Sequence, residues 1–241
     1  RLGKAFNLML DSVEASFQRE KQFNHDVSHE LRTPVAVVLS ESEYGLHYAE
    51  SLEESKESFE IINRQSKRMK EMIGQILDLS KLENQAKLVK ANLSLSDLLA
   101  DKLTDFQKLS QERGLVLEAA IDQDCWIAGD ELLLHRLLDN LISNALKFTK
   151  DRIDLSLQKL DGVCRLTVSD NGAGIAPSEV DKIWDRFYQI DQARSKSNRE
   201  GSGLGLSVVR KIADLHQAQI ELVSELGQGS RFILTFQLEE Q

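Results

Sequence analysis

The sequence predicts a chain in two parts: an all-α helical hairpin, which forms a four-helix bundle when two copies pair, followed by an α+β domain. Two observations carry this prediction. Up to about Asn84, apolar residues recur at the three- and four-residue steps of amphipathic helices. Beyond Asn84, short runs of β-type composition alternate with helical segments, and glycine-rich clusters stand at 170–175 and 201–206.

Length and composition limit the class of protein. A chain of 241 residues can hold two modest domains, each with its own core. The formal net charge of −9 argues against general binding to nucleic acid or to anionic membrane surfaces. Cys125 and Cys164 stand alone among apolar residues, so we expect a reducing compartment, with neither a disulfide framework nor a zinc site. No apolar run reaches about 18 residues, and the helical register at Arg1 leads us to expect an upstream portion.

The first part reads as two long amphipathic helices. The first runs from Leu2 to about Leu46, and its apolar positions are Leu2, Phe6, Met9, Val13, Phe23, Val27, Leu31, Val35 and Val38. We expect the polar stretch from Tyr48 to Lys56 to separate it from the second helix. The apolar positions of the second helix are Ile62, Met69, Met72, Ile76 and Leu79. Because one hairpin cannot cover its own apolar stripe, we expect a homodimer.

A proline follows a histidine within the first predicted helix. Pro34 has no N–H for the carbonyl of Glu30, so the helix is weakened in the turn that carries His29. His29 lies two residues from both Val27 and Leu31, about 200° around the helix, and therefore projects toward solvent. Glu30 can hold the other ring nitrogen or take its proton, which favours a nucleophilic imidazole. The alternative is an ordinary surface histidine.

Five runs of the second part alternate in the manner of β-strands. They are LVLEAAI (115–121), RIDLSLQKL (152–160), VCRLTVSD (163–170), AQIELVSE (218–225) and SRFILTF (230–236). Asp161 and Gly162 between two of them predict a tight hairpin. We therefore expect mixed or antiparallel pairing, with helices over one face of the sheet, rather than a doubly wound parallel sheet.

The predicted helix from Asp130 to Phe148 carries a polar face suited to a metal and phosphate. Its apolar stripe comprises Leu134, Leu138, Leu141, Ala145 and Phe148. On another face, Asn140, Asn144 and Lys147 follow at steps of four and three residues. Amide oxygens suit Mg²⁺, and a lysine suits the phosphates that such a metal carries. The alternative is a solvated helix face.

The two glycine-rich clusters also predict ligand contacts. Asp170 ends an alternating strand and is followed by Gly172 and Gly174. A carboxylate that can accept a hydrogen bond from an amine such as that of adenine thus lies beside backbone that can bend tightly. An ordinary β-turn is the alternative here. In 201–205, three glycines open a helix whose free N–H groups favour an anion, without the GKS or GKT ending of a P-loop.

Five sequence blocks together resemble one family. In chain order they are SHELRTP (28–34), NLISNALKFT (140–149), DNGAGI (170–175), IWDRFYQ (183–189) and GSGLGL (201–206). They resemble the H, N, G1, F and G2 boxes of the sensor histidine kinases of two-component systems, whose ATP-binding domain is an α+β sandwich of the Bergerat or GHKL type. GKAFNLMLDSVEASF (3–17) resembles the last helix of a HAMP relay module, and GQGSRF (227–232) resembles the family's later glycine box.

The resemblance implies a role for each matching residue. His29 would be the phosphoacceptor, with Glu30 as its acidic neighbour and Thr33 as the residue that positions water in members that are also phosphatases. Arg186 and Phe187 would couple the lid to the histidine. ATP and Mg²⁺ would be the implied ligands. The residues that would hold them are Asn140 and Asn144 (metal and phosphate), Lys147 (phosphate), Asp170 (adenine), and Phe148, Gly172, Gly174, Ile175, Phe187, Gly201, Gly203, Leu204 and Gly205 (pocket and lid).

The chain also departs from the family pattern. Trp184 stands where phenylalanine is common, and Glu200 stands where another glycine is frequent. Three basic residues of the lid would either contact phosphate or stay solvated; they are Arg194, Lys196 and Arg199. His25, which precedes Asp26, is the rival acceptor.

The resemblance further implies a layout and a set of partners. The expected segments are the end of an upstream HAMP-like helix (1–18), a dimerisation and phosphotransfer domain (19–84), a hinge linker (85–92) and a catalytic ATP-binding domain (93–241). The expected partners are a second copy and the receiver domain of a response regulator, with no nucleic acid. We expect no membrane contact by this segment, but a cytoplasmic position in a protein anchored in the inner or plasma membrane.

Two other classes of protein share part of this pattern. ATPases of the gyrase, MutL and heat-shock type share the N and G1 patterns but have no reason to carry SHELRTP. A non-catalytic signalling module would have lost some of the nucleotide-site residues, and all of these are present in the sequence.

Overall fold

The computed structural model describes residues 2–84, 90–190 and 201–239. The chain divides into two compact units, Arg1–Gly74 and Gln75–Gln241. The first is a helical hairpin and the second is built around a β-sheet, so the predicted two-part fold is confirmed. Within the described residues, no helix has the length and apolar character that a membrane span requires.

The hairpin consists of α1 (Leu2–His47) and α2 (Leu52–Asn84), the latter contributing its residues up to Gly74 to this unit. The turn between them is shorter than predicted, because part of the polar stretch from Tyr48 to Lys56 is helical. The Ser51 hydroxyl accepts a hydrogen bond from the N–H of Glu54 (3.2 Å), and the Glu54 carboxylate accepts one from the N–H of Glu50 (2.9 Å). Serine followed three residues later by glutamate is a helix-start signal, so the sequence did contain this boundary.

The two helices contact each other near the turn and leave much apolar surface uncovered. The Ser58 hydroxyl donates to Glu41 (3.0 Å), and a Cβ added at Gly45 would touch Ser58 at 3.6 Å. Val35, placed on the packed stripe by the sequence, is 52% exposed in the single chain. Other large apolar side chains of the hairpin that are exposed in one chain include Leu39, Leu46, Leu52, Phe59 and Ile73.

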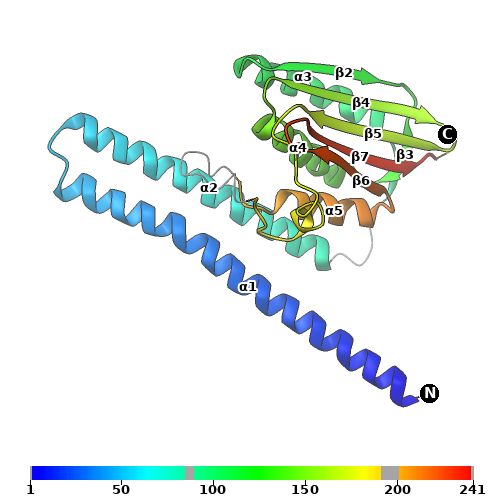
Figure 1. Ribbon diagram of the computed structural model, residues 1–241, viewed down its shortest axis with the longest axis horizontal. Coiled ribbons are helices and arrows are strands. Elements are labelled where there is room, and N and C mark those ends of the chain that lie inside the picture. The colour runs from blue at the N-terminus through cyan, green and yellow to red at the C-terminus, as the bar shows by residue number, and fades with distance from the viewer. Residues whose placement is uncertain (1, 85–89, 191–200, 240–241) are drawn as a thin grey trace. The chain divides into compact units, whose positions relative to one another are not determined.

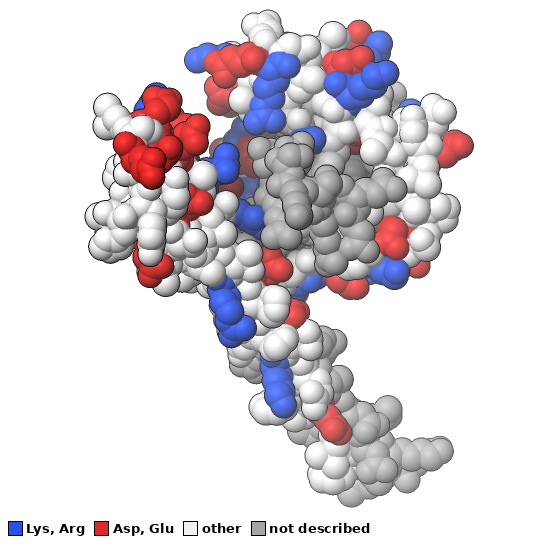
Figure 2. All heavy atoms as spheres, turned by 60° about the vertical axis from the view of Figure 1, so that its left-hand side comes forward, with Lys and Arg blue, Asp and Glu red and all other residues white. Residues whose placement is uncertain are grey.

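Acidic side chains gather at the turn end of the hairpin (Figure 2). Glu50, Glu53 and Glu57 are exposed there, and the Tyr44 hydroxyl donates to Glu54 at 3.2 Å. Much of the net negative charge of the chain is therefore carried at this end of the first unit.

The main sheet of the second unit has the strand order β2-β4-β5-β7-β6. The strands are β2 (Val116–Ile121), β4 (Arg152–Leu160), β5 (Val163–Asp170), β6 (Gln219–Glu225) and β7 (Gly229–Gln237). Gly162 has φ +73° in the β4–β5 hairpin, as the sequence predicted. Because β2 is parallel to β4 and the other pairs are antiparallel, the sheet is mixed.

Two short strands form a separate antiparallel pair, β1 (Ala91–Ser94) with β3 (Trp126–Gly129). Helix α3 (Leu95–Glu112) begins at the Ser94 cap, and α4 (Glu131–Phe148) begins at the Asp130 cap directly after β3. Among the described residues, the remaining helices are α5 (Gly205–Leu215) and the 3₁₀ turn η1 (Lys182–Trp184). Helices α3, α4 and α5 lie over one face of the main sheet (Figure 1).

Alternate residues of the central strands build the core under these helices. Cross-strand rows such as Leu157, Leu166 and Leu234 are all 0% exposed. They meet the buried stripe of α4, which includes Leu134, Leu138, Leu141 and Ala145 as predicted. Phe148, predicted on the same stripe, is 50% exposed because it ends the helix.

The two cysteines are buried free thiols of this unit. Burial raises the pKa of Cys164 to about 12, and the neighbouring Cys125 adds to the shift. The Cys164 side chain therefore stays protonated near neutral pH, and both buried thiols act as small apolar groups of the core.

Candidate functional site

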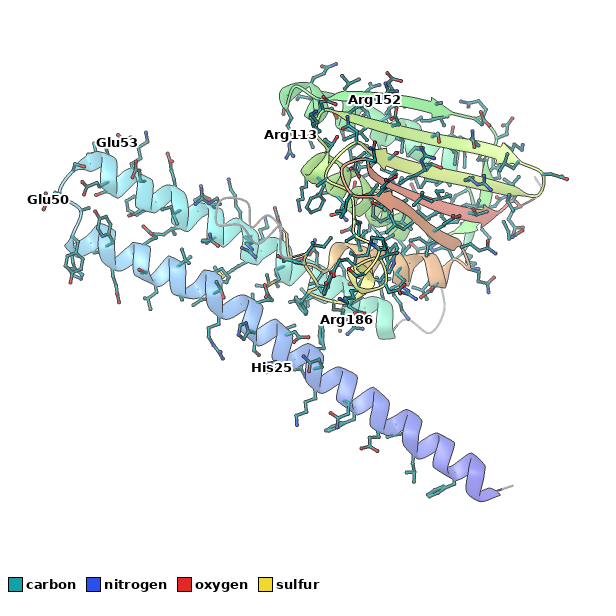
Figure 3. The ribbon with its side chains drawn as sticks, in the orientation of Figure 1. His25, Glu50, Glu53, Arg113, Arg152 and Arg186 are labelled. Carbon is teal, nitrogen blue, oxygen red and sulfur yellow. The ribbon has the colours of Figure 1, made fainter. Side chains whose placement is uncertain are left out.

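The histidine of the first unit lies on the outer side of α1. His29 is exposed, whereas Val27 and Leu31 are half-buried, so the direction inferred from helical spacing is confirmed. Thr33 is also exposed and Glu30 is half-buried. His25, which projects from α1 in Figure 3, is exposed too, with its ring centroid 6.3 Å from that of His29.

Helix α1 continues through Pro34, whose side chain is buried. The missing N–H of Pro34 still leaves the carbonyl of Glu30 without its helical donor, directly after His29. The site therefore combines an accessible imidazole with a helix turn that lacks one backbone bond.

The polar face of α4 forms one wall of a site in the second unit. Asn140 and Asn144 are half-buried and Lys147 is exposed. The amide nitrogen of Asn140 donates to the carbonyl of Arg136 (2.8 Å), which directs its oxygen toward Gly205. The fixed direction of this oxygen fits a hard cation.

The glycine-rich segment 201–205 lies against this wall. A Cβ added at Gly205 would stand 2.9 Å from the Asn140 oxygen, and one added at Gly201 would stand 3.7 Å from Lys147 Nζ. The structure thus brings together two predicted groups that are about 60 residues apart in the sequence. Leu204, in contrast, is 0% exposed and anchors the loop in the core.

Asp170 forms the second wall at the end of β5. It pairs with Ile153 and Ser230 in a row that points into the core, which explains why it is only 8% exposed. Burial raises the pKa of its carboxyl, and hydrogen bonds from the backbone N–H groups of Gly172 and Ser230 oppose that rise. The Gly172 bond is 2.8 Å long.

Gly172 is required by close packing. A Cβ there would overlap the carbonyl of Phe148, so the loop can pass the end of α4 only without a side chain. Ile175, the last residue of the same cluster, donates its N–H to the hydroxyl of Ser224 (2.8 Å). These contacts hold the loop after β5 against both α4 and β6.

Asn171 organises this loop and was missed by sequence reasoning. Its side-chain oxygen accepts from the Thr149 hydroxyl (3.0 Å) and from the N–H groups of Asp151 (3.2 Å) and Arg152 (3.1 Å). Its amide donates to the Asp151 carboxylate (2.6 Å). The asparagine thereby ties the end of α4 to the start of β4 beside Asp170.

The segment after η1 is joined to the glycine loop. Phe187 has φ +61°, a strained value for a bulky residue, and its N–H donates to the carbonyl of Gly203 (3.0 Å). The Gln189 amide donates to the carbonyl of Gly201 (3.1 Å). Both ends of the predicted lid are therefore connected, while Arg194, Lys196, Arg199 and Glu200 lie outside the described residues.

Arg186 and Trp184 lie in the same segment. Arg186, labelled in Figure 3, is half-buried. Trp184 packs edge-on against Phe232 with a centroid distance of 6.0 Å, so the larger ring fits where the family commonly has phenylalanine. Two further contacts of the site, which join residues far apart in the sequence, were missed: Ser202 with Gln75, and Asp78 with Arg136.

Two family models match separate parts of the chain. The model described as "His Kinase A (phospho-acceptor) domain" matches residues 19–85. The model described as "Histidine kinase-, DNA gyrase B-, and HSP90-like ATPase" matches residues 129–240.

Similar full-length proteins carry related names. Sensor histidine kinase CusS of Escherichia coli (strain K12) is 32% identical over 234 residues, which cover 96% of this chain and 48% of CusS. Drug sensory protein A of Synechocystis is 36% identical over 230 residues, which cover 89% of this chain and 34% of that protein. The chain thus spans about half the length, or less, of these relatives.

Solved structures share the fold. Full-length ShkA in complex with AMPPNP is 26% identical with a TM-score of 0.65, and the match covers 89% of this chain and 46% of ShkA. Histidine kinase ThkA, solved in complex with the response regulator protein TrrA, has a TM-score of 0.73 at 21% identity, with coverage of 90% and 61%. At that identity the likeness to ThkA shows the fold alone.

Proposed function

Because the chain belongs to the sensor histidine kinases of two-component systems, we propose that it transfers the γ-phosphoryl group of ATP to His29 and then to an aspartate of a response regulator. The observation that carries this proposal is the pairing, on one chain, of an exposed histidine on a hairpin helix with a candidate nucleotide site. That site joins Asp170, Asn140, Lys147 and the glycines of 201–205.

Asp170 would recognise adenine. Its carboxylate accepts two backbone N–H groups and keeps further lone pairs for the exocyclic amine. Gly172 and Gly174 let the loop pack against the carbonyls of Phe148 and Glu225, and Phe148 and Ile175 would supply apolar surface beside the base. An almost fully buried acceptor discriminates strongly, because a base without the amine would leave it unpaired.

The other wall would hold the triphosphate. The backbone N–H groups of Gly201, Gly203 and Gly205, with the N-terminus of α5, suit phosphate oxygens. Lys147 adds a cation, and the side-chain oxygens of Asn140 and Asn144 would hold Mg²⁺. Bound there, Mg²⁺ would neutralise phosphate charge and help align the γ-phosphate for in-line attack.

His29 would attack through a ring nitrogen. The nitrogen lone pair forms the new bond to the γ-phosphorus while the bond to the bridging oxygen breaks, and ADP leaves. Glu30 would orient the imidazole or take its proton. Arg186 and Phe187 would couple the lid to His29, and Thr33 would position water for dephosphorylation of the regulator.

The proposed layout follows the expected segments: a HAMP-like helix end at 1–18, the phosphotransfer domain at 19–84, a hinge at 85–92 and the catalytic domain at 93–241. Residues 85–89 of that hinge lie outside the described residues. We propose a homodimer, paired through the exposed apolar residues of the hairpin, with a receiver domain docking near His29. We further propose that the whole protein is membrane-anchored and that this segment is cytoplasmic.

The test is incubation of the purified chain with γ-labelled ATP and Mg²⁺, followed by acid and alkali treatment. We expect label that is acid-labile, alkali-stable and lost in both His29→Gln and Asn144→Asp, with His25→Gln as the matched control that keeps it. Label retained by His29→Gln, or release of inorganic phosphate without any phosphoprotein, would contradict the proposal.

A further inference from the structure

The last turns of α2 belong to the second compact unit, which begins at Gln75, directly after Gly74. Gln75, Asp78, Leu79 and Leu82 follow at steps of three, one and three residues and therefore share one helix face. Leu79 and Leu82 are each 1% exposed. This face is thus packed, and its two polar members lie at its start.

Gln75 holds the glycine loop. The Ser202 hydroxyl, in a residue that is 8% exposed, donates to the side-chain oxygen of Gln75 and accepts from the N–H of Leu204 (3.1 Å). Ser202 lies between Gly201 and Gly203, the residues with the greatest backbone freedom in the loop. A contact at Ser202 therefore fixes the part of the loop that would otherwise have the most conformations.

Asp78 holds the turn of α4 that orients Asn140. Its carboxylate lies 2.7 Å from the guanidinium of Arg136, and both side chains are about a quarter exposed (27% and 26%). The carbonyl of Arg136 accepts the hydrogen bond from the Asn140 amide (2.8 Å). The carboxylate on α2 and the candidate metal ligand on α4 are thus linked through one residue.

We propose that Gln75 and Asp78 are positioning residues of the nucleotide site, holding the glycine loop and the Asn140 turn of α4 in the arrangement that receives the triphosphate. The inference rests on the proposed function. A solvated ion pair at a helix surface would contribute little. Here, however, both polar contacts are partly buried, and they adjoin Leu79 and Leu82 on one packed face.

This arrangement has a thermodynamic consequence. If the last turns of α2 favour the nucleotide-binding form of the loop, nucleotide must in return stabilise those turns by the same factor. A change in α2 would thereby reach the ATP site directly through side chains, in addition to any effect carried by the hinge at 85–92.

The experiment measures binding of AMPPNP with Mg²⁺ to the full chain by calorimetry. We expect Gln75→Ala and Asp78→Asn each to weaken affinity by about 3- to 10-fold, because the first removes one polar contact and the second removes the charge of the other. The Asp78→Arg, Arg136→Asp double variant should recover affinity relative to either single charge reversal. Lys81→Ala, an exposed residue one turn further along α2, is the matched control with wild-type affinity.

Two readouts separate positioning from a merely structural role. In autophosphorylation assays the KM for ATP should rise in Gln75→Ala and Asp78→Asn more than kcat falls. Hydrogen exchange at 75–84 should slow on addition of AMPPNP in the wild type and respond less in these variants.

Unchanged or tighter AMPPNP binding in Gln75→Ala and Asp78→Asn would overturn the inference while leaving the kinase proposal intact. A wild-type chain that does not bind AMPPNP at all would overturn both. The two failures are therefore distinguishable.

Discussion

The two units differ in how completely one chain fills their cores. In the hairpin, Leu39 is 59% exposed and Phe59 is 68% exposed. In the sheet unit, Leu138 and Leu166 are 0% exposed, and helices cover the apolar face. A single chain thus completes the nucleotide-binding fold, whereas the helical unit needs a partner to cover its apolar residues.

The polar side chains of the two units differ in exposure in the same way as the apolar ones. His29 of the hairpin is exposed, whereas Asp170 and His216 of the sheet unit are 8% and 7% exposed. An acceptor that must meet both a nucleotide and a second protein has to be reachable. Groups that select a ligand or connect helices and strands form stronger hydrogen bonds when they are buried. The contrast separates the exposed proposed acceptor of the hairpin from buried polar groups of the sheet unit.

The largest expected effect is on the stability of the sheet unit. Gly172→Ala forces a Cβ into the carbonyl of Phe148, so we expect a loss of about 3 kcal/mol or more in the free energy of unfolding, measured by denaturant titration. Gly162→Ala is the control, because Gly162 has φ +73° but nothing within 4 Å, and it should cost only about 1 kcal/mol. Equal losses in the two variants would show that close packing at Gly172 is unimportant.

Asp170→Asn should damage ligand selection without damaging the fold. Loss of the ionised acceptor should weaken AMPPNP binding by about 10- to 100-fold. The unfolding free energy should stay near that of the wild type, since the amide oxygen can still accept from Gly172 and no charge is buried. Asp161→Asn, in the exposed hairpin turn, is the control. Undiminished binding by Asp170→Asn would remove this residue from the site.

On the hairpin side, Phe59→Ser should weaken dimerisation by about tenfold or more, because two copies of this exposed ring lose their burial. Analytical ultracentrifugation measures the dissociation constant. AMPPNP affinity should not change, since the nucleotide site lies in the other unit. A wild-type chain that is monomeric at all concentrations would contradict this view of the hairpin.

The smallest expected effect is the pH dependence of the unfolding free energy. His216 Nε2 accepts the N–H of Asp130 (3.0 Å), while Nδ1 bonds the carbonyl of Ile212 (2.8 Å). Burial lowers the pKa of His216, the charge of Lys90 lowers it further, and the Ile212 bond and Asp130 oppose the shift. The unfolded chain therefore binds the proton more readily than the folded one.

Stability from His216 is fully present above its ordinary pKa of about 6.5 and is lost as pH falls below it, by up to about 1.4 kcal/mol per pH unit. Unfolding free energies at successive pH values below neutrality would show this slope. His216→Gln should flatten the slope, whereas His47→Gln, at an exposed position, should not. If the slope is unchanged in His216→Gln, the pH dependence comes from another titratable group.

Much of the difference between the hairpin and the sheet unit could be predicted from the sequence, because it depends on local patterns. Alternating runs located β4, β5 and β7, the Asp161-Gly162 pair located their hairpin, and helical spacing gave the direction of His29. Strands β1 and β3 were missed because four residues carry too little periodicity, and the start of α2 at Leu52 was missed although Ser51 and Glu54 signal it.

The supporting contacts of the nucleotide site could not be found in this way. Asn171 bonds to Thr149 and Arg152, and Ser202 meets Gln75, over separations at which no sequence pattern relates the partners. Which residues form such pairs depends on how the helices pack on the sheet. Motifs were therefore enough to propose the residues with chemical roles, while the residues that contact them required the fold.

The most direct measurement of the central claim is mapping of the phosphorylated residue by mass spectrometry under alkaline conditions, after incubation with ATP and Mg²⁺. We predict phosphate on His29 in the wild type and far less in Asp170→Asn at the same low ATP concentration, which would link the exposed acceptor of one unit to the buried site of the other. Phosphate on His25 or on a hydroxyl side chain, or an unmodified chain that still converts ATP to ADP, would contradict the account.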